Sequence, residues 1–273
     1  MSDARKVEDF LREDVSADWR DVSSSVVEGE KAEATVFTRD GGVVAGVEEA
    51  CSVFSCLGAE PNPRVEDGER VEPSDVIMEP SGDAVALLRG ERLALNLLGS
   101  MSGIATATRE CVDEVEATGA ETTVAATRKT TPGYRDFEKR SVRLGGGDTH
   151  RHDLTDAVML KENHLELVGL ETAFRRAKER ASFTSKIEVE AEDLRTAERA
   201  AELGADIVLL DNMTPDEVAE AVDRLESHDV TVEASGGITR ENVADYARAG
   251  ADVVSMGSLV HSSDWLDLSM RVE

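Results

Sequence analysis

The sequence predicts an α/β protein of two parts: a C-terminal (β/α) barrel of fewer than eight strands and an N-terminal α/β sandwich domain. From residue 122 onward, short apolar or β-branched runs alternate with amphipathic helical segments. Residues 1–90 lack this alternation and contain short strands and turns instead. A chain of 273 residues that is 40% hydrophobic is long enough to form a barrel and a smaller domain.

Six runs in the second part are expected to be buried strands. They are Thr122–Ala126, Ala157–Leu160, Lys186–Val189, Asp206–Leu210, Val230–Glu233 and Asp252–Ser255. Thr214 followed by Pro215 marks the start of one intervening helix, and Gly204 and Gly250 mark helix ends. Strands separated by single helices run parallel, with right-handed crossovers. Six such units favour a barrel over a doubly wound open sheet, because no glycine-rich nucleotide turn opens the first unit.

The N-terminal part is expected to be a small α/β domain that a long helix joins to the barrel. The expected elements are strands at Thr35–Thr38 and Gly42–Ala45, turns at Asp67-Gly68 and Ser81-Gly82, and a helix at Glu91–Glu116 interrupted near Gly99–Gly103. The expected boundaries are 1–103 for this domain and 104–261 for the barrel. The tail 262–273 is assigned to packing on the N-terminal domain.

The charge of the chain limits its partners and its compartment. A net charge of -27, spread along the chain, opposes binding to nucleic acid or to anionic membranes. This spread, together with 23 arginines among the 30 basic residues, favours adaptation to high salt, where self-repulsion is screened. Met1–Phe10 lacks the apolar core of a signal peptide, and no apolar run approaches the ~18 residues of a membrane helix. We therefore expect a cytoplasmic, soluble protein.

One segment, residues 128–161, reverses the acidic balance. It contains five acidic residues and eight basic ones, Arg128, Lys129, Arg135, Lys139, Arg140, Arg143, Arg151 and Lys161. The segment therefore carries +3, whereas the rest of the chain carries -30. Such an island indicates an anionic ligand, although a salt-bridged helix face is an alternative. Lys139 lies on the predicted helix of this segment, where it either reaches the ligand or occupies a solvated face.

Polar residues follow each of the six predicted strands. They are Thr127–Lys129, Lys161–His164, Glu190, Asp211-Asn212, Ser235–Gly237 and Gly257-Ser258. Barrel enzymes place their working residues at these C-terminal strand ends. Ser235, Gly236 and Gly237 precede a helix, and Gly257 and Ser258 follow one unit later, so that backbone N–H groups can approach a phosphate. Taken alone, the first glycine pair is equally typical of an ordinary turn.

Six segments together carry a resemblance to a known family. They are ERLALNLLGSMSGIAT (91–106), TRKTTPGYRDFEKRSVRLGGGDTHRHDL (127–154), MLKENH (159–164), IEVE (187–190), LLDNM (209–213) and EASGGI (233–238). They resemble quinolinate phosphoribosyltransferase, the decarboxylating enzyme of de novo NAD synthesis. The resemblance implies an N-terminal sandwich, a barrel with fewer than eight strands, and a homodimer whose active sites are completed by the partner subunit.

The resemblance also implies a role for each site residue. The residues implied to bind quinolinate are Arg128, His150, Arg151 and Lys161, with Arg92 from the partner subunit. Lys129, Ser235, Gly236, Gly237, Gly257 and Ser258 are implied to hold the phosphates of phosphoribosyl pyrophosphate. Glu190 and Asp211 are implied to hold Mg²⁺, and with Lys161 they are the candidate catalytic residues. Salt bridges are the structural alternative for the charged residues, and His164 is expected to support the site rather than to react.

Three rival functions remain open on the sequence. A related phosphoribosyltransferase acting on nicotinate, without decarboxylation, needs fewer cations than this cluster provides. A phosphosugar aldolase would use Lys161 as a desolvated amine that forms a Schiff base. A non-catalytic phosphate-binding protein would need neither Glu190 nor Asp211, and both are present.

Overall fold

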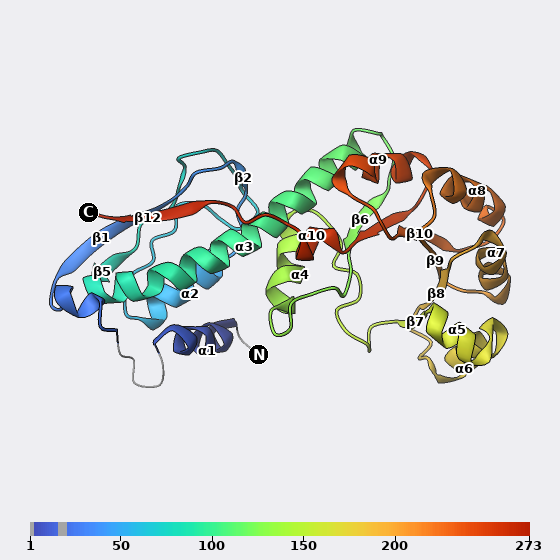
Figure 1. The fold of residues 1–273 in the computed structure, drawn as a ribbon, viewed down its shortest axis with the longest axis horizontal. Coiled ribbons are helices and arrows are strands. Elements are labelled where there is room, and N and C mark those ends of the chain that lie inside the picture. The colour runs from blue at the N-terminus through green and yellow to red at the C-terminus, as the bar shows by residue number, and fades with distance from the viewer. Residues whose placement is uncertain (1–2, 16–20) are drawn as a thin grey trace. The chain divides into compact units, whose positions relative to one another are not determined.

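The computed structural model describes residues 3–15 and 21–273, so residues 1–2 and 16–20 of the predicted N-terminal domain lie outside the described residues. The chain divides into two compact units (Figure 1). One comprises residues 1–107 with the tail 263–273, and the other comprises residues 108–262. Within the described ranges, no helix is long and apolar enough to cross a membrane.

The first unit is an antiparallel sheet covered by helices. Its central strand β1 (Lys31–Thr38) pairs with β4 (Val76–Met78), β5 (Ser81–Asp83) and the tail strand β12 (Leu268–Val272). A separate short ribbon joins β2 (Gly42–Val43) to β3 (Arg70–Val71). The helices are α1 (Asp3–Val15), α2 (Val47–Cys56) and the start of α3 (Ala84–Glu116), with a 3₁₀ turn at Ser24–Val27. The turn expected at Ser81-Gly82 is wrong, because these residues pair with β1 as strand β5.

Helix α3 is continuous, so the expected interruption near Gly99–Gly103 is wrong. The glycines allow close packing of the tail instead of breaking the helix. The Leu266 N–H donates to the Gly99 carbonyl at 3.1 Å. A Cβ on Gly103 would lie 2.1 Å from the Asp264 carbonyl oxygen. The tail backbone therefore lies where a side chain at position 103 would be.

The second unit is a parallel six-stranded barrel-like sheet with helices outside it. Its strands are β6 (Thr123–Ala126), β7 (Val158–Leu160), β8 (Ile187–Ala191), β9 (Ile207–Asp211), β10 (Thr231–Ser235) and β11 (Val253–Met256). Its helices are α4 (Arg135–Leu144), α5 (Glu162–Val168), α6 (Leu170–Arg180), α7 (Leu194–Leu203), α8 (Pro215–Leu225), α9 (Arg240–Arg248), α10 (Ser258–His261) and the end of α3. The strand order β6-β11-β10-β9-β8-β7 has no reversal, which excludes the doubly wound alternative and confirms the predicted barrel class.

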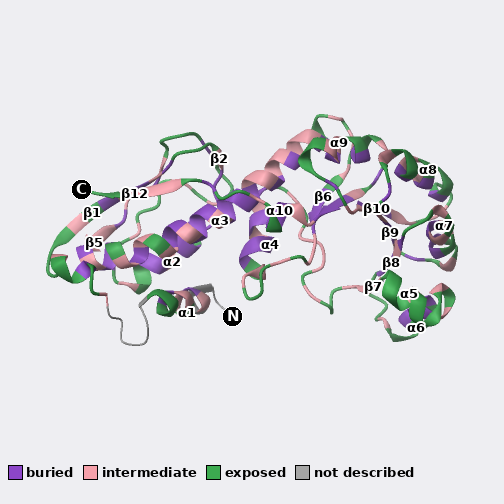
Figure 2. Ribbon diagram, viewed as in Figure 1, coloured by how far each residue is buried: buried purple, intermediate pink, exposed green. Residues whose placement is uncertain are grey.

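The two faces of the barrel sheet differ in chemistry. Residues such as Val189, Val208 and Ala234 belong to the buried apolar core shared with the helices (Figure 2). Alternate residues of the same strands point to the opposite, inner face. This inner face carries Glu188 and Glu233, which are 0% and 2% exposed. Apolar residues therefore hold the strands to the helices, while the barrel interior is polar.

Asp148, in the segment between α4 and β7, pairs with the β6 edge of the sheet. The Ala126 N–H donates to the Asp148 carbonyl at 2.9 Å, and the Asp148 N–H donates to the Val124 carbonyl at 2.8 Å. Helix α4 braces this segment, because the Lys139 ammonium donates to the Thr149 carbonyl. Lys139 is only 2% exposed, so its alternative placement on a solvated face is wrong.

Replacing Gly103 by alanine should destabilise the first unit. Alanine would favour the helix by about 1 kcal/mol. The new Cβ would nevertheless collide with the Asp264 backbone, and overpacking of this kind costs roughly 1–3 kcal/mol. Urea unfolding should show a net loss of stability, whereas Ala107→Ser, at a half-buried position of the same helix, should stay within about 0.5 kcal/mol of wild type. A more stable Gly103→Ala protein would contradict the packing.

Lys139 should make stability depend on alkaline pH. Burial, followed by the positive charge of Arg135, lowers the pKa of Lys139 from 10.5 to about 8. The charged lysine is thus disfavoured in the folded state below pH 8, and this penalty disappears as the pH rises toward 10.5. Between these limits, wild type should gain on the order of 2 kcal/mol in unfolding free energy relative to Lys139→Met. Urea unfolding at pH 7.5 and pH 10 measures this difference, and equal pH responses would contradict it.

Candidate active site

A pocket of about 390 Å³ opens at the C-terminal ends of the barrel strands. It is lined by Thr127, Arg128, Lys129, His150, Arg151, Met159, Lys161, Glu190, Leu209, Asp211, Glu233, Ser235 and Ser255. These residues come from all six strands or from the segments that follow them. The structure therefore brings together eight residues singled out from the sequence: Arg128, Lys129, His150, Arg151, Lys161, Glu190, Asp211 and Ser235.

Two arginines of the pocket have buried hydrogen-bond donors that are not satisfied by the described residues. The Nε atoms of Arg128 and Arg151 are buried, and within the described residues neither has a hydrogen-bond partner. The Arg151 guanidinium otherwise contacts the Met159 sulfur at 2.7 Å and the Ala157 carbonyl at 3.5 Å. Among the described ion pairs, none includes either arginine, so the salt-bridge alternative finds no support for them. Buried donors left in this state are suited to a planar anion such as a carboxylate.

Two acidic residues line the same pocket as these arginines. Glu190 is the next-to-last residue of β8, and Asp211 ends the neighbouring strand β9. Glu190 forms an ion pair with the Lys161 ammonium, and Asp211 accepts from the Asn212 side chain at 2.7 Å. Burial, and then the negative charge of Glu190, raises the pKa of Asp211. Two repelling carboxylates at adjacent strand ends offer the oxygen ligands that Mg²⁺ prefers.

Lys161 does not have the surroundings of a Schiff-base lysine. Its side chain is 49% exposed, and its ammonium is paired with Glu190. An amine that acts as a nucleophile is instead desolvated or placed beside another cation. The aldolase alternative therefore finds no support in this geometry. His164, as expected, supports this layer, because its Nδ1 accepts from the Lys161 N–H at 3.0 Å and caps α5.

His150 occupies a left-handed turn at the edge of the pocket. Its φ of 51° is rare for a residue with a side chain and costs roughly 1–3 kcal/mol. Its N–H donates to Asp148 Oδ1 at 2.6 Å, and its Nδ1 accepts from the Arg151 N–H at 2.6 Å. Its Nε2 lies 3.2 Å from Glu233 Oε2. The turn is therefore held by polar contacts on both sides of the ring.

Two buried carboxyl groups inside the barrel escaped the sequence reasoning. Glu188 and Glu233 lie on the inner face of β8 and β10. Burial, and then the charge of Glu233, raises the pKa of Glu188 to about 7. One signal was available: Glu188 and Glu190 alternate in a single strand, so they had to share a face. Glutamates inside a run expected to be buried indicate an inner polar layer.

The glycine turns border the pocket. Gly236 has a φ of +87°, and a Cβ there would lie 2.3 Å from Asn212 Oδ1. A Cβ on Gly257 would lie 2.8 Å from the Lys129 side chain. Gly236 thus lies against Asn212, and Gly257 lies against Lys129, a predicted phosphate ligand. Gly237 is exposed in the same turn, and Ser258 starts α10 with its hydroxyl 3.4 Å from the Ile238 carbonyl.

The predicted residue Arg92 belongs to the other unit. It lies on the part of α3 within the first unit, where its side chain is exposed. Among the described residues it has no ion pair. The intrachain ion pair considered as an alternative for Arg92 is therefore absent from the described structure.

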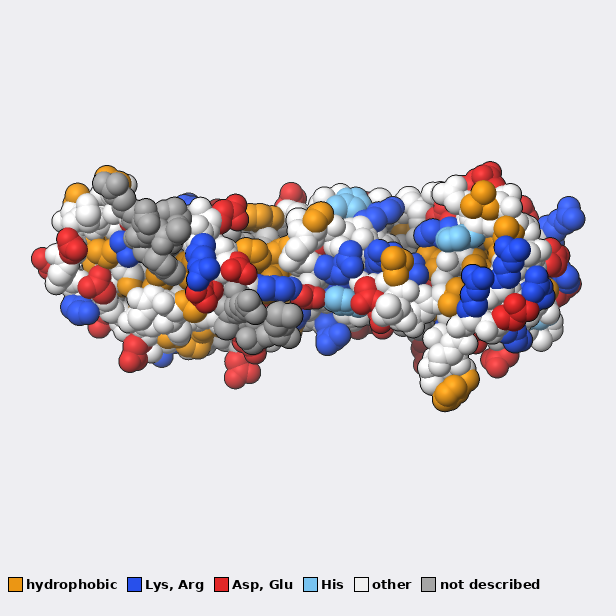
Figure 3. Space-filling model, turned by 90° about the horizontal axis from the view of Figure 1, so that it is seen from below, with side chains coloured by type: hydrophobic (Ala, Val, Ile, Leu, Met, Phe, Trp, Pro, Cys, Tyr) orange, Lys and Arg blue, Asp and Glu red, His pale blue; other side chains and the backbone are white. Residues whose placement is uncertain are grey.

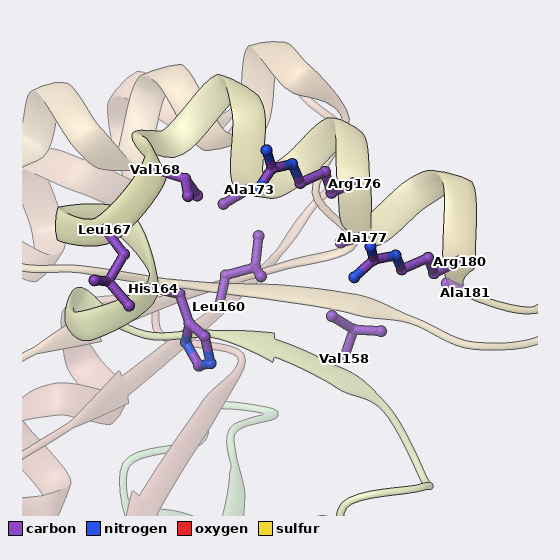
Figure 4. A pocket seen from close by; sticks show the side chains of 10 residues that line it. All are labelled: Val158, Leu160, His164, Leu167, Val168, Ala173, Arg176, Ala177, Arg180 and Ala181. Carbon is purple, nitrogen blue, oxygen red and sulfur yellow. The ribbon is translucent and has the colours of Figure 1, made fainter.

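A second pocket lies between β7 and helices α5 and α6, and its chemistry differs (Figure 4). Its floor is apolar, with Val158, Leu160 and Ala177, and Arg176 and Arg180 extend over it from α6. Of the residues that the structure describes, no carboxylate lines it. On the face shown in Figure 3, basic and histidine side chains gather over the barrel unit. The combination of acids, cations and glycine turns occurs in the first pocket.

Two family models together match nearly the whole chain. The quinolinate phosphoribosyl transferase N-terminal domain matches residues 21–102, and the C-terminal domain of the same family matches residues 104–271. The boundary between the two matches, near residue 103, adjoins the division between the two compact units of the structure.

Similar proteins cover most of the chain as well. A probable nicotinate-nucleotide pyrophosphorylase [carboxylating] of Archaeoglobus fulgidus is 45% identical over 88% of this chain and 94% of its own length. The nicotinate-nucleotide pyrophosphorylase [carboxylating] of Homo sapiens is 39% identical over 98% of this chain and 91% of its own length. The crystal structure of nicotinate-nucleotide pyrophosphorylase from Ehrlichia chaffeensis superposes with a TM-score of 0.94 at 31% identity, over 100% of this chain and 99% of that one. The chain belongs to the quinolinate phosphoribosyltransferase family.

Proposed function

We propose that this protein is a decarboxylating quinolinate phosphoribosyltransferase of de novo NAD biosynthesis. It joins quinolinate to phosphoribosyl pyrophosphate and yields nicotinate mononucleotide, pyrophosphate and CO₂. One observation carries the proposal: the buried Nε atoms of Arg128 and Arg151, which have no hydrogen-bond partner among the described residues, belong to the same pocket as the carboxylates of Glu190 and Asp211. Cations for a diacid and oxygen ligands for a metal thus lie in one cavity.

Quinolinate is a flat dianion, which suits two guanidinium groups. Each guanidinium can hold a carboxylate through two parallel hydrogen bonds, whereas an ammonium acts as a point charge. In the proposed complex, Arg128 and Arg151 hold the carboxylates, Lys161 adds positive charge, and His150 lines the pocket beside them. Nicotinate has one carboxylate, so it would leave part of this cation set unpaired, and a nicotinate-specific enzyme is the less favoured reading.

The second substrate would lie on the glycine side of the pocket. The Lys129 side chain packs against Gly257, and we assign its ammonium to a phosphate near that turn. The turn of Ser235, Gly236 and Gly237 comes shortly before α9, and glycine turns before a helix are suited to bringing backbone N–H groups close to a phosphate. Phosphate sites after the last strands of a barrel are common. We therefore assign the 5-phosphate of the sugar to these turns.

Mg²⁺ fits the carboxylates of Glu190 and Asp211. Asp211 and Glu190 would hold it, directly or through water, because they offer hard oxygen ligands and repel one another without it. When bound, Mg²⁺ supplies positive charge that neutralises the pyrophosphate leaving group. These two carboxylates also face the place where positive charge develops on the sugar.

The residues of the pocket would mainly position and stabilise. Arg128 and Arg151 orient quinolinate so that its ring nitrogen can attack C1 of the sugar. Glu190 and Asp211 stabilise the oxocarbenium character at that carbon, and Lys161 keeps Glu190 in place. The product nitrogen is cationic, so it accepts the electron pair released when the adjacent carboxylate leaves as CO₂. No covalent nucleophile is required.

The assembly and the setting of the enzyme are also proposals. An exposed Arg92 without an ion pair among the described residues suits a side chain that completes the site of a partner subunit, as in the homodimer that the family resemblance implies. The dispersed charge of -27 suits a cytoplasm with a high salt content. The same charge opposes partners such as nucleic acid.

A product assay tests the proposed reaction directly. With quinolinate, phosphoribosyl pyrophosphate and Mg²⁺ in high salt, we expect stoichiometric nicotinate mononucleotide and ¹⁴CO₂ from carboxyl-labelled quinolinate. Chelation of Mg²⁺ should abolish both. Nicotinate tested in parallel should give little product, and a preference for nicotinate would overturn the assignment.

Arg128→Ala is the matched variant for this assay. It should lower kcat/KM for quinolinate by about 100-fold, because loss of a charge-assisted hydrogen bond costs roughly 3 kcal/mol. Arg143→Ala removes an exposed arginine of the same basic segment and should behave like wild type. Near-normal kinetics of Arg128→Ala would count against the pocket.

Subunit mixing tests the shared site. Arg92→Ala and Lys161→Ala proteins should each be nearly inactive as homodimers. If Arg92 serves the partner's pocket, a hybrid dimer retains one intact site, and an equal mixture should regain up to about a quarter of wild-type activity. A mixture as inactive as its two components would argue against a site completed by the partner.

A further inference from the structure

We propose that Glu233 is a positioning residue that fixes the ring of His150 and, through it, the backbone of Arg151, so that the Arg151 guanidinium is held ready for a substrate carboxylate. The inference deepens the proposed function and rests on it for the identity of the anion. Glu233 lies on β10, and its side chain lines the pocket. Three observations support it.

The first observation is the pattern of partners around the imidazole. The Arg151 N–H donates to Nδ1 of His150, so that nitrogen carries a lone pair. The proton of the neutral ring is then on Nε2, which lies 3.2 Å from Glu233 Oε2 and donates to it. A hydrogen bond to one ring nitrogen thus determines what the other can do, as it does for histidines whose tautomer is set by a carboxylate.

The second observation is the backbone at the turn. His150 is in the left-handed region, which the chain adopts when surrounding contacts impose it. Asp148 accepts the N–H of His150, and Lys139 donates to the carbonyl of Thr149. Those contacts fix the residues before His150, whereas the imidazole fixes the backbone of Arg151, which follows it. Loss of the correct tautomer would remove the hydrogen bond from the Arg151 N–H to the ring.

The third observation is the burial of Glu233. It is 2% exposed, and its second oxygen, Oε1, has no hydrogen-bond partner among the described residues. Glu188 lies close enough to oppose its charge, with Oε1 at 3.9 Å from the same imidazole nitrogen. A buried carboxylate beside a second carboxyl group is unfavourable unless a hydrogen-bond or ionic partner compensates it. Its one described hydrogen-bond partner is the His150 ring.

The arrangement is suited to a carboxylate rather than to a metal ion. One atom each of His150, Glu188 and Glu233 lie within 4.8 Å of one another, as in some metal sites. Both ring nitrogens of His150 are already used, however, one by a backbone N–H and one by Glu233. A histidine without a free lone pair cannot coordinate a metal. The chain of contacts instead leads from Glu233 to Arg151.

Two substitutions of similar size separate positioning from bulk. Glu233→Gln keeps an oxygen that can accept from Nε2, whereas Glu233→Met keeps the length and removes the acceptor. We expect Glu233→Met to raise the KM for quinolinate about tenfold or more, with kcat and the KM for phosphoribosyl pyrophosphate changed less than threefold. The KM of Glu233→Gln for quinolinate should stay much closer to that of wild type. Equal effects of the two substitutions, or an equal loss for both substrates, would overturn the proposal.

A double-mutant cycle tests whether Glu233 acts through His150. In a His150→Ala background, Glu233→Met should weaken quinolinate binding by less than about twofold, because the intermediate ring is absent. A loss as large as in wild type would show that Glu233 acts independently and would refute the pathway. Asp252→Asn is the control, since Asp252 accepts a backbone N–H at the other end of the barrel strands, and it should leave the KM unchanged.

A spectroscopic measurement without substrate distinguishes failure of this inference from failure of the proposed function. In ¹⁵N-histidine-labelled protein, the His150 signals, assigned by their loss in His150→Ala, should show a protonated Nε2 and an unprotonated Nδ1. Glu233→Met should change this pattern, and Glu233→Gln should preserve it. A protonated Nδ1 in wild type would overturn the inference whatever the substrate. Correct signals in a protein that fails to bind quinolinate would instead refute the proposed function.

Discussion

The pocket depends on keeping two arginine Nε atoms buried with no hydrogen-bond partner in the described part of the chain. Such donors are unfavourable in a folded protein, so the surrounding structure has to hold Arg128 and Arg151 in place. The loop after β6 is held by Glu138, which is 3% exposed and accepts from the Thr131 N–H at 3.0 and 3.2 Å. The segment that carries Arg151 is held by Lys139 and by its pairing with β6. Adjacent residues of α4 thus brace both arginine-bearing loops.

The polar interior of the barrel follows from the same requirement. A barrel of this size is usually filled by branched apolar side chains, whereas here the inner face carries Glu188, Glu190, Asp211 and Glu233. The apolar requirement is met on the outer face, where Val208, Leu210 and their neighbours pack under the helices. Each strand therefore contributes polar side chains to the inner face and apolar side chains to the outer face, because adjacent side chains point to opposite faces.

Prediction from sequence succeeded where a periodic pattern determined the structure. All six barrel strands lie within two residues of the predicted runs, because burial on the outer face requires continuous apolar segments. Prediction failed at Gly99–Gly103, where the glycines do not break the helix. They make room for the tail, which lies more than 160 residues away in the chain. Prediction also placed Ser81-Gly82 in a turn, although pairing with β1 makes it a strand. Local preferences cannot reveal partners that are distant in sequence.

For the site, strand-end reasoning located the residues that face the opening but overlooked those beneath them. Arg128, Lys161 and Asp211 follow strands, so a rule about strand ends finds them. Glu233 lies two residues before a strand end, inside a run read as core, and its contact with His150 spans 83 residues of sequence. Such contacts depend on the register of β10 against the segment between β6 and β7. Sequence patterns therefore identify the groups that can meet a substrate, whereas the groups that orient them become visible only when the strands are in register.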